Sequence, residues 1–372
     1  MKYYVIAGER SGDLHGGNLI RSIQHYDPEA VFRGFGGDDM QEAGMVLTRH
    51  YRDLEFMGLA ALVTELRKIF KNLAVCKEDI RRFKPDVIVC IDYGGFNRRV
   101  AKFGREEGIP VHYYIPPKVW AWYQSRARDL KKNVTRMFVI LPFEKDFYKK
   151  FGMEVDYVGN PVLDAVKAAQ PAPNFRNELA LDGARPVVAL LPGSRKSELR
   201  GIVPLMADLI RANPQWQFVV AAVSSLDDAL YAPLRQSGVI FLKDRTYDLL
   251  QNADAAVVTS GTATLETALF QVPQAVVFRT GALEYFLARQ VVKVKFISLV
   301  NLIAGREVVR ELIQDLAVEE VVSAEVKRLL TDSQYRHGVK SGYREIYNTL
   351  DVGSASDNAA RLMTQYLRSG HL

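Results

Sequence analysis

The chain has few of the residues on which several classes of protein depend. Its 372 residues include only two cysteines, Cys76 and Cys90. Two thiols in a chain of this length are too few for a structural zinc site, and we expect both to be reduced. No run approaches the roughly 20 apolar residues that a membrane-spanning helix needs, and the first residues lack the apolar core of a signal peptide. The sequence therefore predicts a cytoplasmic protein that does not span a membrane.

Signatures of common cofactors are also missing. The glycine-rich turn at residues 8–13 lacks the G-x-G-x-x-G spacing of a dinucleotide fingerprint, which argues against a nicotinamide-dependent reductase. The sequence contains no G-x-x-x-x-G-K-[ST] loop, no D-x-D pair of carboxylates and no histidine–cysteine cluster. The sequence thus gives no indication of a metal ion or a cofactor.

Positive charge is concentrated in the first half of the chain. Lys and Arg outnumber Asp and Glu by 27 to 22 over residues 1–170 and by 22 to 21 over the remainder, which gives the net charge of +6. Such an excess favours a polyanionic partner: a nucleic acid, a phosphorylated substrate or an anionic membrane surface. Because the sequence has no zinc-finger spacing and no aromatic RNA-binding strand, we expect no nucleic-acid partner.

Short apolar runs alternate with longer amphipathic segments, which predicts parallel sheets whose strands are joined by helical crossovers. The expected strands of the first half are residues 3–7, 31–35, 87–91, 111–115 and 137–141, and those of the second half are residues 187–191, 217–223, 239–241, 255–259 and 274–278. The stretch at 167–174, with two prolines and small residues, indicates a linker between the two sets. Residues 324–372 carry helical patterns and no convincing strand.

The predicted fold is therefore α/β: two Rossmann-like, doubly wound domains facing a central cleft, with a helical C-terminal tail. The predicted limits are residues 1–168 for the first domain, 175–330 for the second and 331–372 for the tail. We expect the tail to pack back on the N-terminal domain or on a partner subunit. Sheets of this kind bind ligands beyond the carboxyl ends of their strands, so candidate site residues are sought in the loops after strands.

Two such loops in the first domain carry candidates. The turn at residues 8–13 leads into a helix expected from about Leu14 to His25, and its Ser11, Gly12 and Asp13 favour an anion at the helix start or serve only as caps. Asp92 ends the apolar strand 87–91, where desolvation would raise its pKa toward that of a useful general base. Its alternative role is to cap the helix expected near Asn97 or to brace the glycine turn.

A third loop of the first domain is rich in tryptophan. Trp120 and Trp122 follow the double proline at 116–117, which stiffens the loop. Their indoles could hold an apolar or sugar-like ligand, or serve as buried anchors.

The second domain has two loops of the kind that binds phosphate. Each places glycine and polar residues after a strand and at the start of a helix, where backbone amides face an anion. An arginine in the first loop adds a fork-shaped donor suited to a diphosphate, and Glu266 in the second could accept ribose hydroxyls or offset the helix dipole. The candidate residues are Gly193, Ser194, Arg195 and Glu198 in the first loop, and Ser260, Gly261, Thr262, Ala263 and Glu266 in the second.

Taken together, these blocks resemble the lipid-A-disaccharide synthase family of GT-B glycosyltransferases over essentially the whole chain. The matching blocks are residues 7–13, 91–92, 119–122, 141–145, 191–195, 260–266 and 301–307. The resemblance implies that UDP-2,3-diacylglucosamine donates its sugar to the 6'-hydroxyl of 2,3-diacylglucosamine 1-phosphate (lipid X), with inversion and release of UDP, in lipid A biosynthesis.

The resemblance also implies roles for the candidate residues. Asp92 would take the proton from the acceptor hydroxyl, with Ser11, Gly12 and Asp13 on the acceptor side. Arg195, with the amides of Gly193 and Ser194, would hold the diphosphate. The loop from Ser260 to Glu266 would seat the nucleotide, and the block that begins at Asn301 would contribute to the donor site. Many family members carry a proline and a second aspartate after Asp92, where this chain has Gly94 and Gly95, so that second carboxylate is absent.

Acylated substrates imply contact with a membrane surface, which we expect to be peripheral and on the inner face of the inner membrane. Residues 56–71 combine an apolar face with basic neighbours, as an interfacial helix does, although a core helix has the same pattern. The candidate membrane-facing residues are Met57, Leu59, Leu62, Val63, Leu66, Ile69 and Phe70. The family further implies a homodimer that exchanges C-terminal segments.

Two other functions share these loops. Another UDP-sugar GT-B enzyme or epimerase would need no surface for acyl chains. A catalytically inert nucleotide-sugar binding protein would bind UDP and be indifferent to loss of Asp92.

Overall fold

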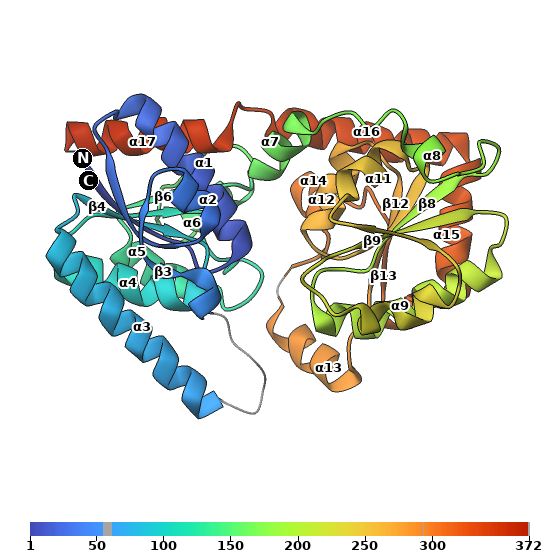
Figure 1. The fold of residues 1–372 in the computed structure, drawn as a ribbon, viewed down its shortest axis with the longest axis horizontal. Helices are drawn as coiled ribbons and strands as arrows, with labels where there is room; N and C mark the ends of the chain where they lie inside the picture. The colour runs from blue at the N-terminus through green and yellow to red at the C-terminus, as the bar shows by residue number, and fades with distance from the viewer. Residues whose placement is uncertain (55–61, 293, 371–372) are drawn as a thin grey trace. The chain divides into compact units, whose positions relative to one another are not determined.

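The computed structural model of the protein describes residues 1–54, 62–292 and 294–370 (Figure 1). The chain forms two compact units, each built on a parallel sheet. Unit 1 comprises residues 1–161 and 352–372, and unit 2 comprises residues 162–351. The predicted linker at 167–174 lies within unit 2, where the Ala172 N–H donates to Gln251 Oε1 at 2.9 Å. The domain boundaries expected from the sequence, at residues 1–168, 175–330 and 331–372, remain a prediction.

The sheet of unit 1 has the strand order β3-β2-β1-β4-β5-β6-β7. Its strands are β1 (Lys2–Ile6), β2 (Val31–Gly36), β3 (Val46–His50), β4 (Val87–Ile91), β5 (Val111–Tyr114), β6 (Arg136–Val139) and β7 (Asp156–Tyr157). Its helices are α1 (Arg10–Tyr26), α2 (Asp38–Glu42), α3 (Leu62–Phe83), α4 (Gly94–Glu106), α5 (Arg126–Asn133), α6 (Glu144–Lys149) and α17 (Ala355–Ser369), with α7 (Pro161–Ala168) at the boundary. All strand pairs are parallel, so the prediction of helical crossovers is confirmed.

The core of unit 1 lies on both faces of this sheet. On one face, alternate residues of β1 and β4 pack against α1 and α17. On the other face the Tyr4 hydroxyl donates to Asp79 of α3 at 3.0 Å, and the Arg33 Nε donates to the same carboxylate at 2.9 Å. These bonds lower the pKa of Asp79 against the opposing effect of its burial. The polar network thus fixes α3 on the sheet.

Helix α17 closes the face that α1 begins, and the two helices lie side by side in unit 1 (Figure 1). Ala359, Ala360 and Met363 are fully buried in the core on this side of the sheet. At the far end of α17, the Tyr366 hydroxyl donates to Asp156 at 3.2 Å and its ring lies 4.1 Å from the Arg136 guanidinium carbon. The last helix of the chain is therefore part of the first sheet's core.

The sheet of unit 2 has the order β10-β9-β8-β11-β12-β13. Its strands are β8 (Val187–Leu191), β9 (Gln217–Ala222), β10 (Ile240–Lys243), β11 (Ala255–Thr259), β12 (Gln274–Phe278) and β13 (Glu311–Ile313). Its helices are α8 (Phe175–Glu178), α9 (Lys196–Ala212), α10 (Ala232–Arg235), α11 (Thr246–Asn252), α12 (Thr262–Leu269), α13 (Ala282–Val291), α14 (Leu299–Ala304), α15 (Glu319–Thr331) and α16 (Ser333–Leu350). Helices α9 and α15 pack together on one face of this sheet, and α8 and α11 pack on the other.

Three strands were not expected from the sequence: β3, β7 and β13. All three pair at or near a sheet edge and are short, with at most five residues each. Helix α1 also begins at Arg10 and not near Leu14, so the turn after β1 is shorter than predicted. Among the described residues, no helix is both long enough and apolar enough to cross a bilayer.

Candidate active site

In unit 1 the candidate residues collect where the strand order reverses. The chain winds outward from β1 through β2 to β3 on one side, and from β4 through β5 to β7 on the other. At such a reversal the two flanking loops diverge and leave room for a ligand beyond the carboxyl ends of the strands. The loop after β1 and Asp92 after β4 occupy this position because Ile6 and Cys90 are register partners.

The backbone at Asp92 is held in an uncommon conformation. Asp92 and Tyr93 have φ angles of +43° and +48°, in the left-handed region that aspartate tolerates better than most residues. The Asp92 N–H donates to the carbonyl of Ile115 at 3.1 Å, and its carbonyl accepts from the Tyr113 hydroxyl at 2.6 Å and from Asn97 Nδ2 at 2.9 Å. The N-cap position of α4 belongs to Tyr93, so Asp92 is not the capping residue of that helix. Contacts with Tyr113 of β5 and with Ile115, the next residue after that strand, thus fix the position of the Asp92 backbone. The Asp92 residue is partly exposed.

Close packing ties the three loops of this edge together. A Cβ atom on Gly8 would come within 2.2 Å of the Tyr93 ring, and one on Gly94 would come within 2.8 Å of Pro117. The Tyr93 ring in turn stacks on Phe96 at 5.2 Å between centroids. Glycine at positions 8 and 94 is therefore required for the loops after β1, β4 and β5 to approach one another.

The acceptor-side candidates lie in the first turn of α1. Ser11 is exposed, and its hydroxyl donates to Glu9 Oε1 at 2.6 Å. Gly12 is buried beside Ala7. Asp13 is 1% exposed, and its carboxylate accepts from the amides of Gly37, Asp39 and Met40 at 2.6 to 3.1 Å. Asp13 therefore holds the start of α2 against α1, and Ser11 is the candidate of this group whose side chain is at the surface.

Glu144 is a chemically prominent residue that the sequence analysis quoted only within a matching block. It is 2% exposed at the start of α6, and burial raises its pKa to about 7. Its Oε1 atom accepts from the Trp120 indole N–H at 3.1 Å and its Oε2 atom accepts from the Leu141 amide at 3.0 Å. Trp120 is itself buried, packed edge to face on Phe143 at 5.0 Å. Glu144 thus connects the loop after β6 to the tryptophan loop after β5.

In unit 2 both expected phosphate loops lie at the corresponding reversal, between β8 and β11. Val258 and Leu191 are register partners, so the loops beginning at Pro192 and Ser260 are neighbours. Gly193 has a φ of +107°. The sheet order, and not chain proximity, brings these two segments together.

In the first of these loops, Glu198 accepts the hydrogen bonds of the turn. Its Oε2 atom accepts from the amides of Ser194 and Arg195 at 3.0 and 3.2 Å, and its Oε1 atom accepts from Arg195 Nη1 at 3.1 Å. A Cβ atom on Gly193 would lie 2.4 Å from Glu198 Oε2. The Arg195 side chain remains 78% exposed. The loop is therefore built to surround a carboxylate at the start of α9, a place that also suits an anionic ligand.

The second loop places Ser260, Gly261, Thr262 and Ala263 at the start of α12. The Ser260 hydroxyl donates to the Ile297 carbonyl at 2.9 Å, while Gly261 and Thr262 are exposed. One turn further on, Glu266 accepts from the Tyr247 hydroxyl at 3.0 Å, and burial raises its pKa. Tyr247 follows β10 and was not identified from the sequence, because nothing in its local pattern indicates a partner on α12.

Asn301 is fully buried and bonded within the protein. Its Oδ1 atom accepts from the amides of Val308 and Val309, and its Nδ2 atom donates to the Val309 carbonyl and to Glu311. The same carboxylate accepts from the Ser298 hydroxyl at 2.7 Å. Asn301 thus stabilises the segment whose Ile297 carbonyl accepts from the Ser260 hydroxyl. An effect of Asn301 on a ligand would therefore act through the backbone of this segment.

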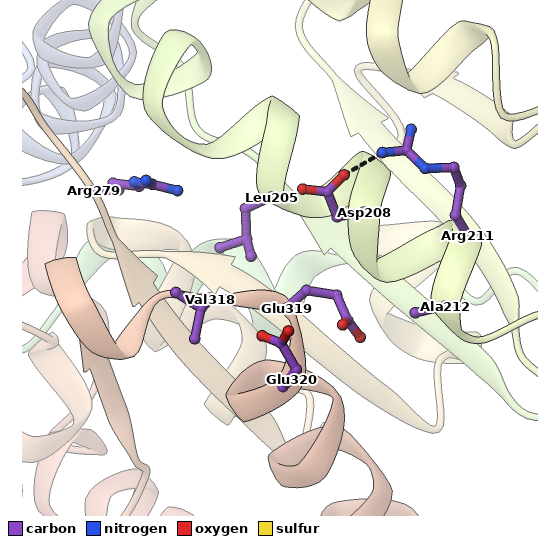
Figure 2. A pocket seen from close by; sticks show the side chains of 8 residues that line it. All are labelled: Leu205, Asp208, Arg211, Ala212, Arg279, Val318, Glu319 and Glu320. Carbon is purple, nitrogen blue, oxygen red and sulfur yellow. Dashed lines mark hydrogen bonds and ion pairs between the residues drawn. The ribbon is translucent and has the colours of Figure 1, made fainter.

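A pocket elsewhere in unit 2 contains none of the candidates. It has a volume of about 540 Å³ and lies between α9 and the start of α15. Figure 2 shows the Asp208–Arg211 ion pair of α9 on one side and Glu319 and Glu320 on the other. Among the described residues, no group of three or more histidine, cysteine or acidic side chains is arranged to hold a metal ion.

The described residues include only part of the expected membrane-facing segment. Met57 and Leu59 lie outside the described residues. Leu62, Val63 and Leu66 belong to α3, which begins at Leu62, and Ile69 of the same helix is partly exposed. Phe70 is 56% exposed and lies 5.9 Å from the guanidinium carbon of Arg99.

Comparisons with known proteins agree along the whole chain. The family model for lipid-A-disaccharide synthetase matches residues 3–363. The chain belongs to the lipid-A-disaccharide synthase family. The synthase of Geobacter metallireducens is 37% identical over 370 residues, covering 98% of this chain and 96% of the relative. That of Myxococcus xanthus is 36% identical over 375 residues, covering 99% and 98%.

Solved structures show the same fold at low sequence identity. The UDP-GlcNAc 2-epimerase from Neisseria meningitidis bound to UDP-GlcNAc has a TM-score of 0.66 and 13% identity, and covers 99% of this chain and 100% of that chain. The kitacinnamycin glycotransferase has a TM-score of 0.63 and 14% identity, covering 98% and 99%. These likenesses support the GT-B architecture of two Rossmann-like sheets.

Membership of the lipid-A-disaccharide synthase family confirms the predicted activity class. The protein is a glycosyltransferase of lipid A biosynthesis. The epimerase alternative is not supported, because that likeness extends to the fold alone. The inert binding protein is not supported, because the relatives are named as synthases.

Gly193→Ala tests the geometry of the first phosphate loop. The new Cβ atom would meet Glu198 in a backbone conformation that side chains rarely adopt. Strain of about 1–2 kcal/mol should weaken UDP binding about tenfold, measured by isothermal titration calorimetry. Gly183→Ala is the matched control, because Gly183 has open space around it. Equal UDP affinity in both variants would contradict this role of the loop.

The buried carboxyl of Glu144 predicts a pH-dependent stability. Since its pKa is raised to about 7 in the folded state, folding favours the protonated form. Its contribution is therefore fully present below the ordinary carboxyl pKa and is lost as the pH rises through about 7. The free energy of unfolding of the wild type should fall relative to that of Glu144→Gln between about pH 5 and pH 8, as measured by denaturant titration. Parallel pH profiles for the two proteins would refute it.

Proposed function

We propose that the protein transfers 2,3-diacylglucosamine from its UDP derivative to the 6'-hydroxyl of 2,3-diacylglucosamine 1-phosphate, with inversion at the anomeric carbon and release of UDP. The observation that carries the proposal is the placement of Asp92 at the sheet reversal of unit 1, in a family of glycosyltransferases that act in lipid A biosynthesis. An inverting displacement needs a base for the acceptor hydroxyl, and a positioned carboxylate serves this purpose.

In this proposal Asp92 accepts the proton of the 6'-hydroxyl as the hydroxyl oxygen forms its bond to the anomeric carbon. The backbone bonds to Ile115, Tyr113 and Asn97 hold the residue in place, so little motion is needed before proton transfer. The acceptor meets the loop after β1, where Ser11 is at the surface and Gly12 and Asp13 maintain the turn of α1.

Unit 2 supplies the donor site in this proposal. Arg195 and the amides of Gly193 and Ser194 bind the diphosphate, and they stabilise the charge that develops on UDP as the glycosidic bond breaks. The carboxylate of Glu198 accepts from the amides of Ser194 and Arg195 and orders this turn. The start of α12, from Ser260 to Ala263, receives the nucleotide. Glu266, held by Tyr247, accepts the ribose hydroxyls, while Asn301 acts by positioning the backbone beside Ser260.

Both substrates carry acyl chains, and we propose that the enzyme binds the inner face of the inner membrane as a peripheral protein. The exposed ring of Phe70 on α3 supports this assignment for the segment 56–71. Basic residues on the same helix, among them Lys68 and Lys71, suit anionic lipid head groups. We also propose a homodimer that exchanges C-terminal segments, because the apolar face of α17 would serve equally well on a second copy of unit 1.

The central test is transfer from radiolabelled UDP-2,3-diacylglucosamine in detergent, with Asp92→Asn beside the wild type. Asparagine suits the left-handed backbone, so the fold is kept while the base is removed. A loss of about a hundredfold or more in kcat with unchanged UDP affinity is expected. Asp86→Asn, at the opposite end of β4, is the matched control and should retain activity. A fully active Asp92→Asn enzyme would overturn the assignment of the base, and an inactive wild type would overturn the substrate pair.

Membrane binding is tested by sedimentation with anionic phospholipid vesicles. Phe70→Ser should weaken binding about tenfold, the cost of removing one inserted aromatic side chain. Val31→Ser, which alters another exposed apolar residue of unit 1, should bind as the wild type does. If both variants bind equally well, α3 is not the membrane contact.

A further inference from the structure

We propose that residues 115–125 form an acceptor-recognition loop, in which Trp122 and Tyr123 contact the glucosamine phosphate and Glu144 positions them through the Trp120 indole. This inference rests on the proposed function, because it names the element of unit 1 that binds the acceptor.

The loop presents two large aromatic side chains to solvent. Trp122 is 49% exposed and Tyr123 is 52% exposed, whereas Trp120, two residues earlier, is 5% exposed. Tyr123 also has a φ of +56°, which only a loop fixed by its surroundings keeps in a residue of this size. One tryptophan therefore anchors the loop and the other lies at its surface.

The loop is continuous with the proposed base. The carbonyl of Ile115, its first residue, accepts from the Asp92 N–H at 3.1 Å, and Pro117 lies against Gly94. A displacement of the loop would be transmitted directly to the Asp92 backbone. A molecule whose hydroxyl reaches Asp92 would therefore have this loop beside it.

Charge on the loop suits an acceptor that carries a phosphate. Lys118 within the loop and Arg126, the first residue of α5 directly after it, are both exposed, and the Arg126 guanidinium carbon lies 4.4 Å from the Tyr123 ring centroid. An arginine placed on an aromatic face keeps its outer edge for a phosphate, while aromatic faces accept the apolar side of a sugar ring. A monosaccharide phosphate offers both features.

Glu144 holds this loop in place through hydrogen bonds. Its two oxygens accept from Trp120 and Leu141, and Gln124 Nε2 donates to the Trp120 carbonyl at 3.0 Å. Lys118 and Tyr148 are the other ionisable groups that face Glu144, and the Lys118 charge opposes the effect of burial on its pKa. A glutamine at this position has one acceptor oxygen and one NH₂ group, so it cannot offer a separate acceptor atom to each of the two donors. Glu144 thus acts as a positioning residue.

The experiment measures acceptor kinetics at saturating donor in detergent micelles. Trp122→Ala should raise the acceptor KM about tenfold with the donor KM, the UDP affinity and the melting temperature unchanged. Trp122→Phe, which keeps an aromatic face, should restore most of the loss. Glu144→Gln and Trp120→Phe should each raise the acceptor KM several-fold, and the double variant should be no worse than the poorer single variant, because both break the same bond.

An unchanged acceptor KM in Trp122→Ala, in a wild-type background that transfers sugar, would overturn this inference and leave the proposed function intact. Additive effects of Glu144→Gln and Trp120→Phe would overturn the positioning role. Reduced binding to anionic vesicles with normal acceptor KM in micelles would show instead that Trp122 contacts the bilayer. Absence of transfer by the wild type would overturn the proposed function itself.

Discussion

The reversal of strand order at the centre of each sheet is the constraint on which the candidate site depends. In unit 1 the reversal lies between β1 and β4, and in unit 2 it lies between β8 and β11. Crossovers on either side of the reversal run to opposite faces of the sheet, so no helix covers the loops that diverge there. Asp92, Arg195 and Ser260 are far apart in the sequence, yet each lies in the loop that follows a strand at such a reversal.

These loops approach one another closely at points where glycine has no side chain to prevent it. Gly8 leaves room for the Tyr93 ring, and Gly193 leaves room for the Glu198 carboxylate. In both places the ring or the carboxylate fills the space that a Cβ atom would need. The ring packs against the neighbouring loop, and the carboxylate accepts hydrogen bonds from the turn that contains Gly193. The glycines of the motifs therefore serve the contacts between loops, and a ligand meets a surface that is already ordered.

The sequence was sufficient to predict the strands that form the middle of each sheet, because they are continuous apolar runs bounded by turns. It did not indicate β3, β7 and β13, which lie at or near sheet edges, where burial on both faces is not required. The loops were located correctly because strand ends define them. The partners of individual side chains were not predictable: Asp13 bonds to amides of the loop after β2, and Glu266 bonds to Tyr247 of α11. Such contacts depend on which strands are neighbours, and periodicity carries no information about that order.

Glu144 is an ionisable residue at a buried position, and its hydrogen bond to the distant Trp120 explains why a carboxyl group is found there. A carboxyl group at full burial is costly, and glutamine or an apolar residue would be easier to accommodate. Two donors converge there, the indole N–H of Trp120 and the amide of Leu141, and the carboxyl group offers each of them its own oxygen. The energetic cost of the buried carboxyl is thus linked to the placement of one loop. That loop begins at Ile115, whose carbonyl accepts from the Asp92 N–H, so the buried carboxyl group and the proposed base are both bonded to the same loop.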